Sequence, residues 1–262
     1  MAQSIRQPLA QTASPRLLTW IRGESTVANS TRVWLVLLAF IGLTNLFITF
    51  VGAGLQDDPR SVLFSWPAIA VFGVLGFVGI VLSHRTGFPA AWDHDVSTRQ
   101  RWLIPAVIGV ALGCLQSGLD TVFHWTAFYT QIVGQAYNAP WPGSPLFYTS
   151  GAIVVEVFYR LLPVPLLLWL VSNVLLRGRG QSQIFSILAV LSSLIEPADQ
   201  DLRVLDRGAS WPMVASTFVP DLLLNLAQVV IFRRYGFLAA ITTRVAFYMV
   251  WHVAYGNFIC AC

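Results

Sequence analysis

The sequence predicts an all-α fold, a polytopic membrane helix bundle of about seven transmembrane helices. The composition points there, because 56% of the 262 residues are hydrophobic and only 11% are charged. The long apolar runs point the same way, since a helix needs roughly 20 apolar residues to cross about 30 Å of hydrocarbon. Soluble domains carry far more charge. We therefore expect an integral membrane protein.

Seven segments reach or approach this length. Five are well defined and cover residues 33–55, 62–83, 102–126, 148–176 and 236–256. Two are weaker, because 183–195 is short and 211–232 contains Pro220 and Asp221. The first segment is too long for the core of a signal peptide and lacks a small-residue cleavage pattern, so we expect it to stay in the membrane.

The arginines predict the orientation of the bundle. All 16 basic residues are arginine, and eleven of them lie before the first span or in alternate connections between spans. Cytoplasmic loops of membrane proteins carry such an excess of positive charge. The N-terminus is therefore predicted to be cytoplasmic and the C-terminus outside, in a bacterial cytoplasmic (inner) membrane.

The chain divides into a tail and one membrane domain. Residues 1–31 are rich in Ser, Thr, Gln and Pro, which predicts a flexible cytoplasmic tail. Residues 32–262 are expected to form a single transmembrane helical domain. The three cysteines are too few for a disulfide framework, and the ending Cys-Ala-Cys does not fit the C-a-a-X prenylation signal.

Several classes of site have no signal in the sequence. We find no zinc-type Cys or His spacing, no glycine-rich phosphate loop and no nucleophile elbow. The basic residues lie at membrane boundaries, where topology already accounts for them. We therefore predict no metal, no cofactor and no nucleic-acid partner. The expected partners are the lipid bilayer and other membrane protein subunits.

The stretch IVVEVFYRLLPVP, residues 153–165, places Glu156 and Arg160 one helical turn apart inside an apolar run. Such residues share a helix face and can form a charge-assisted contact. A charge at the bilayer centre costs ~2.5–3.5 kcal/mol on insertion scales, so these groups usually have partners inside the protein. The pair is either a self-neutralising element or part of a site beside the bend that Pro163 and Pro165 predict.

Other polar residues are expected in the outer half of the bundle. They come from several helices and are Asp120, His124, Glu196, Arg244 and His252. Outer span ends are normally polar, which explains Asp120, His124 and Glu196 equally well. Glu156 and Arg244 lie too deep for that explanation, so we treat both as candidate site residues.

The region 148–252 resembles the CAAX protease and bacteriocin-processing (CPBP) family of intramembrane proteases. That family carries three helical motifs, the first of which is Glu-Glu-x-x-x-Arg. VEVFYR is similar to it, with Val155 at the first glutamate position, Glu156 at the second and Arg160 at the arginine. The resemblance implies a CPBP-like core over about 148–256.

The second and third motifs follow in the same order. SSLIEPADQ resembles the Phe-x-x-x-His motif, with Glu196 at the phenylalanine and Gln200 at the histidine. RRYGFLAAITTRVAFY resembles the motif His-x-x-x-Asn or Asp, with Arg244 at the histidine and Tyr248 at the last position. All three motifs are therefore degenerate.

These departures bear on chemistry. In the family, the first glutamate activates a water molecule, and the histidines with the Asn or Asp polarise it and hold the oxyanion. Val155 cannot accept a proton, Gln200 cannot exchange one, and Arg244 is a permanent cation. The resemblance thus implies a pseudoenzyme that kept the scaffold and lost the chemistry.

Our first hypothesis is a non-catalytic binding, assembly or accessory subunit of a membrane complex. In it, Glu156 and Arg244 form a structural ion pair across two spans where the active site would have been. A variant is a pigment- or haem-containing complex in which His124 or His252 is an axial ligand.

The second hypothesis is an active CPBP-type intramembrane endopeptidase with a shifted site. Its catalytic residues would be Glu156, Arg160 and His252, with Glu156 as base and His252 orienting water, helped by Glu196 or His124. A transporter or ion-conducting role is a further alternative, because a buried acid, a buried base and a kinked helix also suit a proton path.

Overall fold

A computed structural model of the chain describes residues 26–52 and 54–260, and every regular element in these ranges is a helix. Six helices are long and apolar enough to cross a membrane: Val27–Phe50, Trp66–Arg85, Arg99–Phe123, Ser144–Leu175, Trp211–Tyr235 and Phe237–Phe258. The predicted all-α membrane bundle is therefore confirmed.

Three of these spans are built from more than one helical piece. The first half of the chain comprises α2 (Thr26–Phe50), η1 (Pro59–Phe64), α3 (Trp66–Arg85), η2 (Arg99–Leu103), α4 (Ile104–Phe123) and α5 (Trp125–Val133). The fourth span is α6 (Ser144–Glu156), η3 (Val157–Leu161), α7 (Pro163–Leu168) and η4 (Trp169–Leu175). Then come α8 (Gln181–Asp201), η5 (Leu202–Arg207), α9 (Trp211–Tyr235), α10 (Phe237–Tyr248), η6 (Met249–Tyr255) and α11 (Gly256–Phe258).

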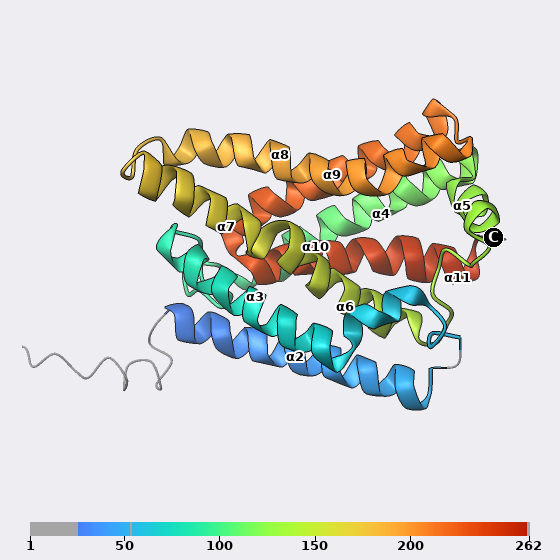
Figure 1. Cartoon of the computed structure of the whole chain (residues 1–262), viewed down its shortest axis with the longest axis horizontal. Helices are drawn as coiled ribbons and strands as arrows, with labels where there is room; N and C mark the ends of the chain where they lie inside the picture. Colours follow the sequence, from blue (N-terminus) through green and yellow to red (C-terminus); the bar gives the residue numbers. More distant parts are fainter. Residues whose placement is uncertain (1–25, 53, 261–262) are drawn as a thin grey trace, which may run out of the picture.

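Figure 1 shows the long helices side by side, with α2 and α3 along one edge of the bundle and α8 and α9 along the other. Helix α10 lies between these edges and packs against α4, α6 and α9. Side chains of α10 thus reach the middle of the bundle. Arg244 is carried there, on a helix whose apolar residues are largely buried.

The α4–α10 contact is close because glycines of α4 face it. A Cβ atom added to Gly109 would lie 2.1 Å from the carbonyl oxygen of Thr243, and one added to Gly113 would lie 3.0 Å from that of Phe247. Small residues at this spacing let helix backbones approach each other in membranes. The contact at Thr243 therefore holds α10 against α4 next to the position of Arg244.

The bend expected at Pro163 and Pro165 takes the form of a π-helical turn. Residues Val157–Leu161 form η3, whose end is closed by the Leu162 N–H donating to the Val157 carbonyl at 3.3 Å. Pro163 then opens α7, a position at which its missing N–H costs no hydrogen bond. Glu156 directly precedes this irregular turn, and Arg160 lies within it.

The seventh predicted crossing is where the structure and the sequence differ. Segment 183–195 is helical within α8, but α8 is not among the six apolar spans, because its last turns carry Glu196, Asp199 and Asp201. Nevertheless α8 runs the length of the bundle beside α9 (Figure 1).

Other boundaries shift by a few residues. The predicted tail 1–31 lies outside the described residues except for 26–31, which begin α2. The span expected to reach residue 126 ends at Phe123, because His124 adopts a left-handed φ of 56°. A short helix, α5, follows between the third and fourth spans.

Candidate functional site

Two carboxylates and two guanidinium groups lie buried in the middle of the bundle. Arg160 Nε contacts Glu156 Oε2 at 2.7 Å, and Arg244 contacts both oxygens of Glu196 at 2.5 and 2.6 Å. Arg160 Nη1 is 3.9 Å from Glu196 Oε2 and links the two pairs. The four charges balance, which is the condition under which buried ions are tolerated.

Helix α9 contributes two buried amides to this cluster. Asn225 Oδ1 accepts hydrogen bonds from Arg160 Nη1 and, at 3.3 Å, from Arg244 Nη2. Gln228 Oε1 accepts from Arg244 Nε at 3.0 Å, and its Nε2 donates to Glu156 Oε2 at 3.4 Å. Sequence reasoning missed both amides, although two amides three residues apart in a span were a usable signal.

The predicted ion pair between Glu156 and Arg244 is replaced by a different pairing. Arg244 pairs with Glu196, while Glu156 pairs with Arg160 on its own helix. Gln228 lies between Glu156 and Arg244 and bonds to both. The reason is geometric, because α8 brings Glu196 to Arg244 in a two-oxygen contact that leaves Glu156 to its neighbour one turn away.

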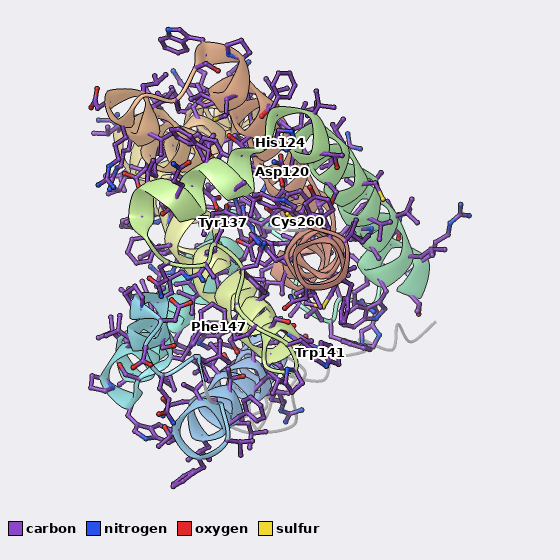
Figure 2. All side chains as sticks on the ribbon, turned by 90° about the vertical axis from the view of Figure 1, so that its right-hand side faces the viewer. Asp120, His124, Tyr137, Trp141, Phe147 and Cys260 are labelled. Carbon is purple, nitrogen blue, oxygen red and sulfur yellow. The ribbon has the colours of Figure 1, made fainter. Side chains whose placement is uncertain are left out.

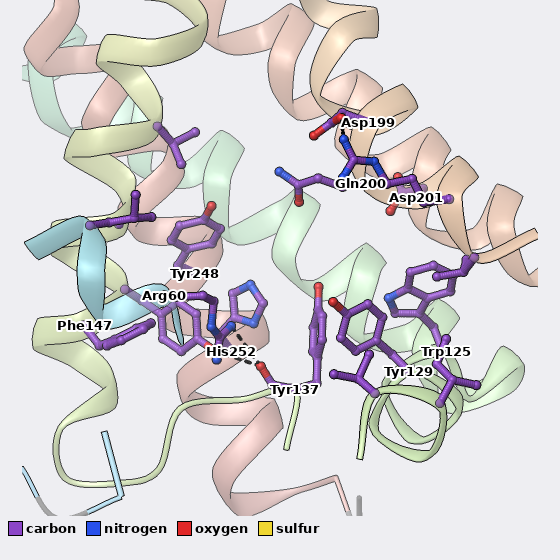
Figure 3. Close-up of a pocket in the computed structure, with 18 of the residues that line it drawn as sticks. Arg60, Trp125, Tyr129, Tyr137, Phe147, Asp199, Gln200, Asp201, Tyr248 and His252 are labelled. Atoms are coloured by element: carbon purple, nitrogen blue, oxygen red, sulfur yellow. Dashed lines mark hydrogen bonds and ion pairs between the residues drawn. The ribbon is translucent and has the colours of Figure 1, made fainter. Parts of the chain in front are cut away.

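A cavity of about 620 Å³ lies beside this ion cluster, at the end of the bundle where η1, α5 and η5 gather (Figure 3). Three predicted motif positions line it, Val155, Gln200 and Tyr248, and so does His252 of the shifted-site hypothesis. The Tyr248 hydroxyl accepts from Arg244 Nη1 at 3.0 Å, and Gln200 Nε2 donates to Glu196 Oε1 at 3.4 Å. The structure therefore brings the degenerate motif positions together, with the ion cluster directly behind two of them.

His252 is held in an aromatic environment. Its ring stacks on Tyr148 with centroids 4.2 Å apart and planes at 4°, and Tyr248 and Tyr137 lie 5.0 and 5.6 Å away. Its Nδ1 is 2.8 Å from Asn138 Oδ1. Neither contact involves Glu156, so the structure does not join these two residues as the shifted-site hypothesis requires.

Asp120 and His124 lie at the C-terminal end of α4, away from the ion cluster. Asp120 Oδ1 accepts the backbone N–H of Thr126 at 2.8 Å, which caps the start of α5. His124 is exposed and, with Asp120 and Cys260, lines a separate cavity of about 250 Å³. In the end-on view of Figure 2, Asp120 and His124 lie on the other side of Tyr137 from Phe147. Across the described ranges, we find no group of three or more His, Cys, Asp or Glu placed to hold a metal ion.

The acidic stretch after Glu196 has two different environments. Asp199 forms an ion pair with Arg203, one helical turn away, and both are solvent-exposed. Asp201 is buried, and its Oδ2 makes no hydrogen bond. Burial, reinforced by the nearby carboxylate of Asp221, raises the pKa of Asp201 to about 9.

Comparison of the chain with family models, curated proteins and solved structures finds no match. The family resemblance therefore depends on the residues and their arrangement alone.

Proposed function

We propose that this integral membrane protein is a non-catalytic relative of the CPBP intramembrane proteases that acts as a binding, assembly or accessory subunit of a membrane complex. One observation carries the proposal. Around the cavity, the positions that would activate and polarise water are occupied by Val155, Gln200 and Tyr248. None of these side chains can act as a general base at neutral pH.

The carboxylates behind the cavity support the same conclusion. Glu196 is held by both of its oxygens to Arg244, and Glu156 is bound to Arg160. A carboxylate held through both oxygens, as Glu196 is, is a poor proton acceptor, because taking a proton would break a buried ion pair. The cluster instead ties α6, α8, α9 and α10 together around a preserved cavity.

The location is part of the proposal. We place the chain in a bacterial cytoplasmic membrane with a cytoplasmic N-terminus, other membrane subunits as partners, and no nucleic acid. In this orientation α8 makes a seventh crossing and the C-terminus is outside. The cavity then opens on the outer side, as α2 runs towards that end of the bundle (Figure 1).

A cleavage assay tests the proposal. Purified full-length protein and its Glu156→Gln variant are incubated with a panel of membrane-anchored peptides, and both are expected to give no turnover. Turnover that Glu156→Gln abolishes would contradict the non-catalytic assignment. Mild extraction from native membranes tests the accessory role, for which a stoichiometric partner is expected; isolation as a lone monomer would count against it.

The second candidate is an active endopeptidase with Glu156 as base. One observation favours it, since Glu156 Oε1 and Arg160 Nη2 are buried and form no hydrogen bond, so the cluster has unused polar atoms. Against it, Val155 rather than Glu156 lines the cavity. The same cleavage assay separates the two candidates.

A further inference from the structure

The cavity contains one buried carboxyl group that has no cation beside it. Asp201 is 3% exposed, lines the cavity, and its Oδ2 makes no hydrogen bond. The neighbouring carboxyl group of Asp221 adds negative charge rather than balancing it. Buried carboxylates are normally paired with a cation or strongly hydrogen-bonded. Asp201 thus differs from Glu156 and Glu196, which both have arginine partners.

An aromatic wall faces this carboxyl group, and we define it as Trp125, Tyr129, Tyr137 and Tyr148, all of which line the cavity. Tyr129 and Tyr137 have ring centroids 4.9 Å apart, and Trp125 is 6.2 Å from Tyr129. Figure 3 shows Trp125, Tyr129 and Tyr137 on the opposite side of the cavity from Asp199, Gln200 and Asp201. Aromatic faces attract cations through the ring quadrupole, and groups of them bind quaternary ammonium ligands.

The arginines of the cavity are already neutralised or lie at its exposed rim. Arg60 is bound to Asp58 through both carboxylate oxygens and donates to the Tyr137 carbonyl at 3.1 Å. Arg203 is paired with Asp199, and Arg207 is solvent-exposed. An anion would therefore compete with existing carboxylates. A cation would instead meet the carboxyl group of Asp201, and its positive charge would favour the ionised form of that group.

We propose that the cavity binds an organic ammonium group between the carboxylate of Asp201 and the aromatic wall, an inference that rests on the proposed role as a binding protein. The volume of about 620 Å³ suits a small-molecule ligand and exceeds one ammonium head. The rest of the ligand then occupies the remaining space. Such a group is carried both by free amines such as choline and by the headgroups of lipids.

Binding of choline to the full-length protein in an uncharged detergent tests this inference. Isothermal titration is combined with tryptophan fluorescence, since Trp125 is part of the wall. The neutral isostere of choline, 3,3-dimethylbutanol, has the same shape without the charge. We expect saturable choline binding and an affinity for the isostere that is at least tenfold weaker.

Two variants locate the site. Asp201→Asn keeps the size of the side chain and is expected to weaken choline binding at least tenfold, because the countercharge is lost. Asp206→Asn is the matched control: it removes one carboxylate from the neighbouring η5 turn, where Asp206 is exposed and does not line the cavity. Tyr129→Leu should weaken choline binding while leaving that of the isostere within about twofold.

Three results would overturn the inference: equal affinity for choline and its isostere, unchanged binding in Asp201→Asn, or no saturable binding of choline. Competition in nanodiscs identifies the source of the ammonium group. Phosphatidylcholine that displaces choline, where phosphatidylglycerol does not, indicates a lipid headgroup, and the absence of displacement indicates a free amine. Because binding is measured without any peptide substrate, its failure is distinguishable from a failure of the non-catalytic assignment.

Discussion

At position 244 one guanidinium group contacts side chains from three helices. It binds Glu196 of α8, Asn225 and Gln228 of α9, and Tyr248 of its own helix. Because Arg244 is buried, each of these contacts forms in an environment of low dielectric constant. Loss of one member leaves its partners buried and unpaired, which costs more than the net contribution of the pair.

A double-mutant cycle tests which carboxylate Arg244 depends on. Arg244→Met and Glu196→Gln are each expected to lower the free energy of unfolding by about 3–5 kcal/mol, and the double variant should recover part of the loss. The cycle with Glu156→Gln should show a smaller coupling energy, since Gln228 separates Glu156 from Arg244. Denaturant unfolding in detergent provides the measurement. A larger coupling with Glu156 would restore the pairing that the sequence predicted.

Asp201 predicts a pH dependence of stability. The folded state holds its proton up to about pH 9, whereas an unfolded aspartate releases it near pH ~3.9. Its protonated form therefore contributes stability that is fully present below pH ~4 and is lost as the pH rises towards 9. The slope reaches at most about 1.4 kcal/mol per pH unit.

Unfolding is compared between pH 6 and pH 9 in the wild type, Asp201→Asn and the control Asp206→Asn. Asp221, Glu196 and the Thr217 hydroxyl surround the Asp201 carboxyl group and are present in all three proteins. The loss of stability at high pH should be smaller in Asp201→Asn alone. Parallel pH profiles for all three proteins would show that Asp201 does not retain its proton.

At the scale of elements, the sequence predicted where the apolar helices lie but not how they meet. The apolar runs at 33–55 and 236–256 predicted two spans, because the length of an apolar run can be counted within one segment of the sequence. The partner of Arg244 could not be read in this way, since Glu196 is 48 residues distant in the chain. That choice depends on how α8 and α9 pack, which no single segment encodes.

The site itself was predicted in part. The motif positions Val155, Gln200 and Tyr248, which the sequence singled out through the family resemblance, line one cavity. The aromatic wall was not predicted, because Tyr129 and Tyr137 lie in the segment between the predicted spans 102–126 and 148–176, which contains no charged residue. The left-handed His124 that starts α5 has no signal in a hydropathy pattern.

Two glycines of α4 give a matched test of the α4–α10 contact. Gly109→Ala should lower the free energy of unfolding by about 1–3 kcal/mol, because the new methyl group would meet the Thr243 carbonyl at 2.1 Å. Gly118→Ala is the control, since a Cβ there meets nothing within 4 Å and alanine favours helix. Thermal unfolding of both variants provides the measurement. Equal stability would mean that the two helices do not pack this closely.

At the scale of the whole molecule, the role of α8 decides how the bundle sits in the membrane. With α8 as a seventh crossing, the arginines in the last turn of α9 face the cytoplasm and satisfy the positive-inside rule. With six crossings, Arg233 and Arg234 would face outside. Glu196 costs α8 little as a crossing, because Arg244 neutralises it within the protein.

Cysteine labelling of the full-length protein in intact cells distinguishes the two topologies. Asp206→Cys, just after α8, and Arg179→Cys, just before it, both replace exposed side chains. If α8 crosses, a membrane-impermeant maleimide labels Asp206→Cys in intact cells and labels Arg179→Cys only after permeabilisation, as read by mass spectrometry of the labelled peptides. Protection of both sites until the cells are opened would place the two ends of α8 on the cytoplasmic side.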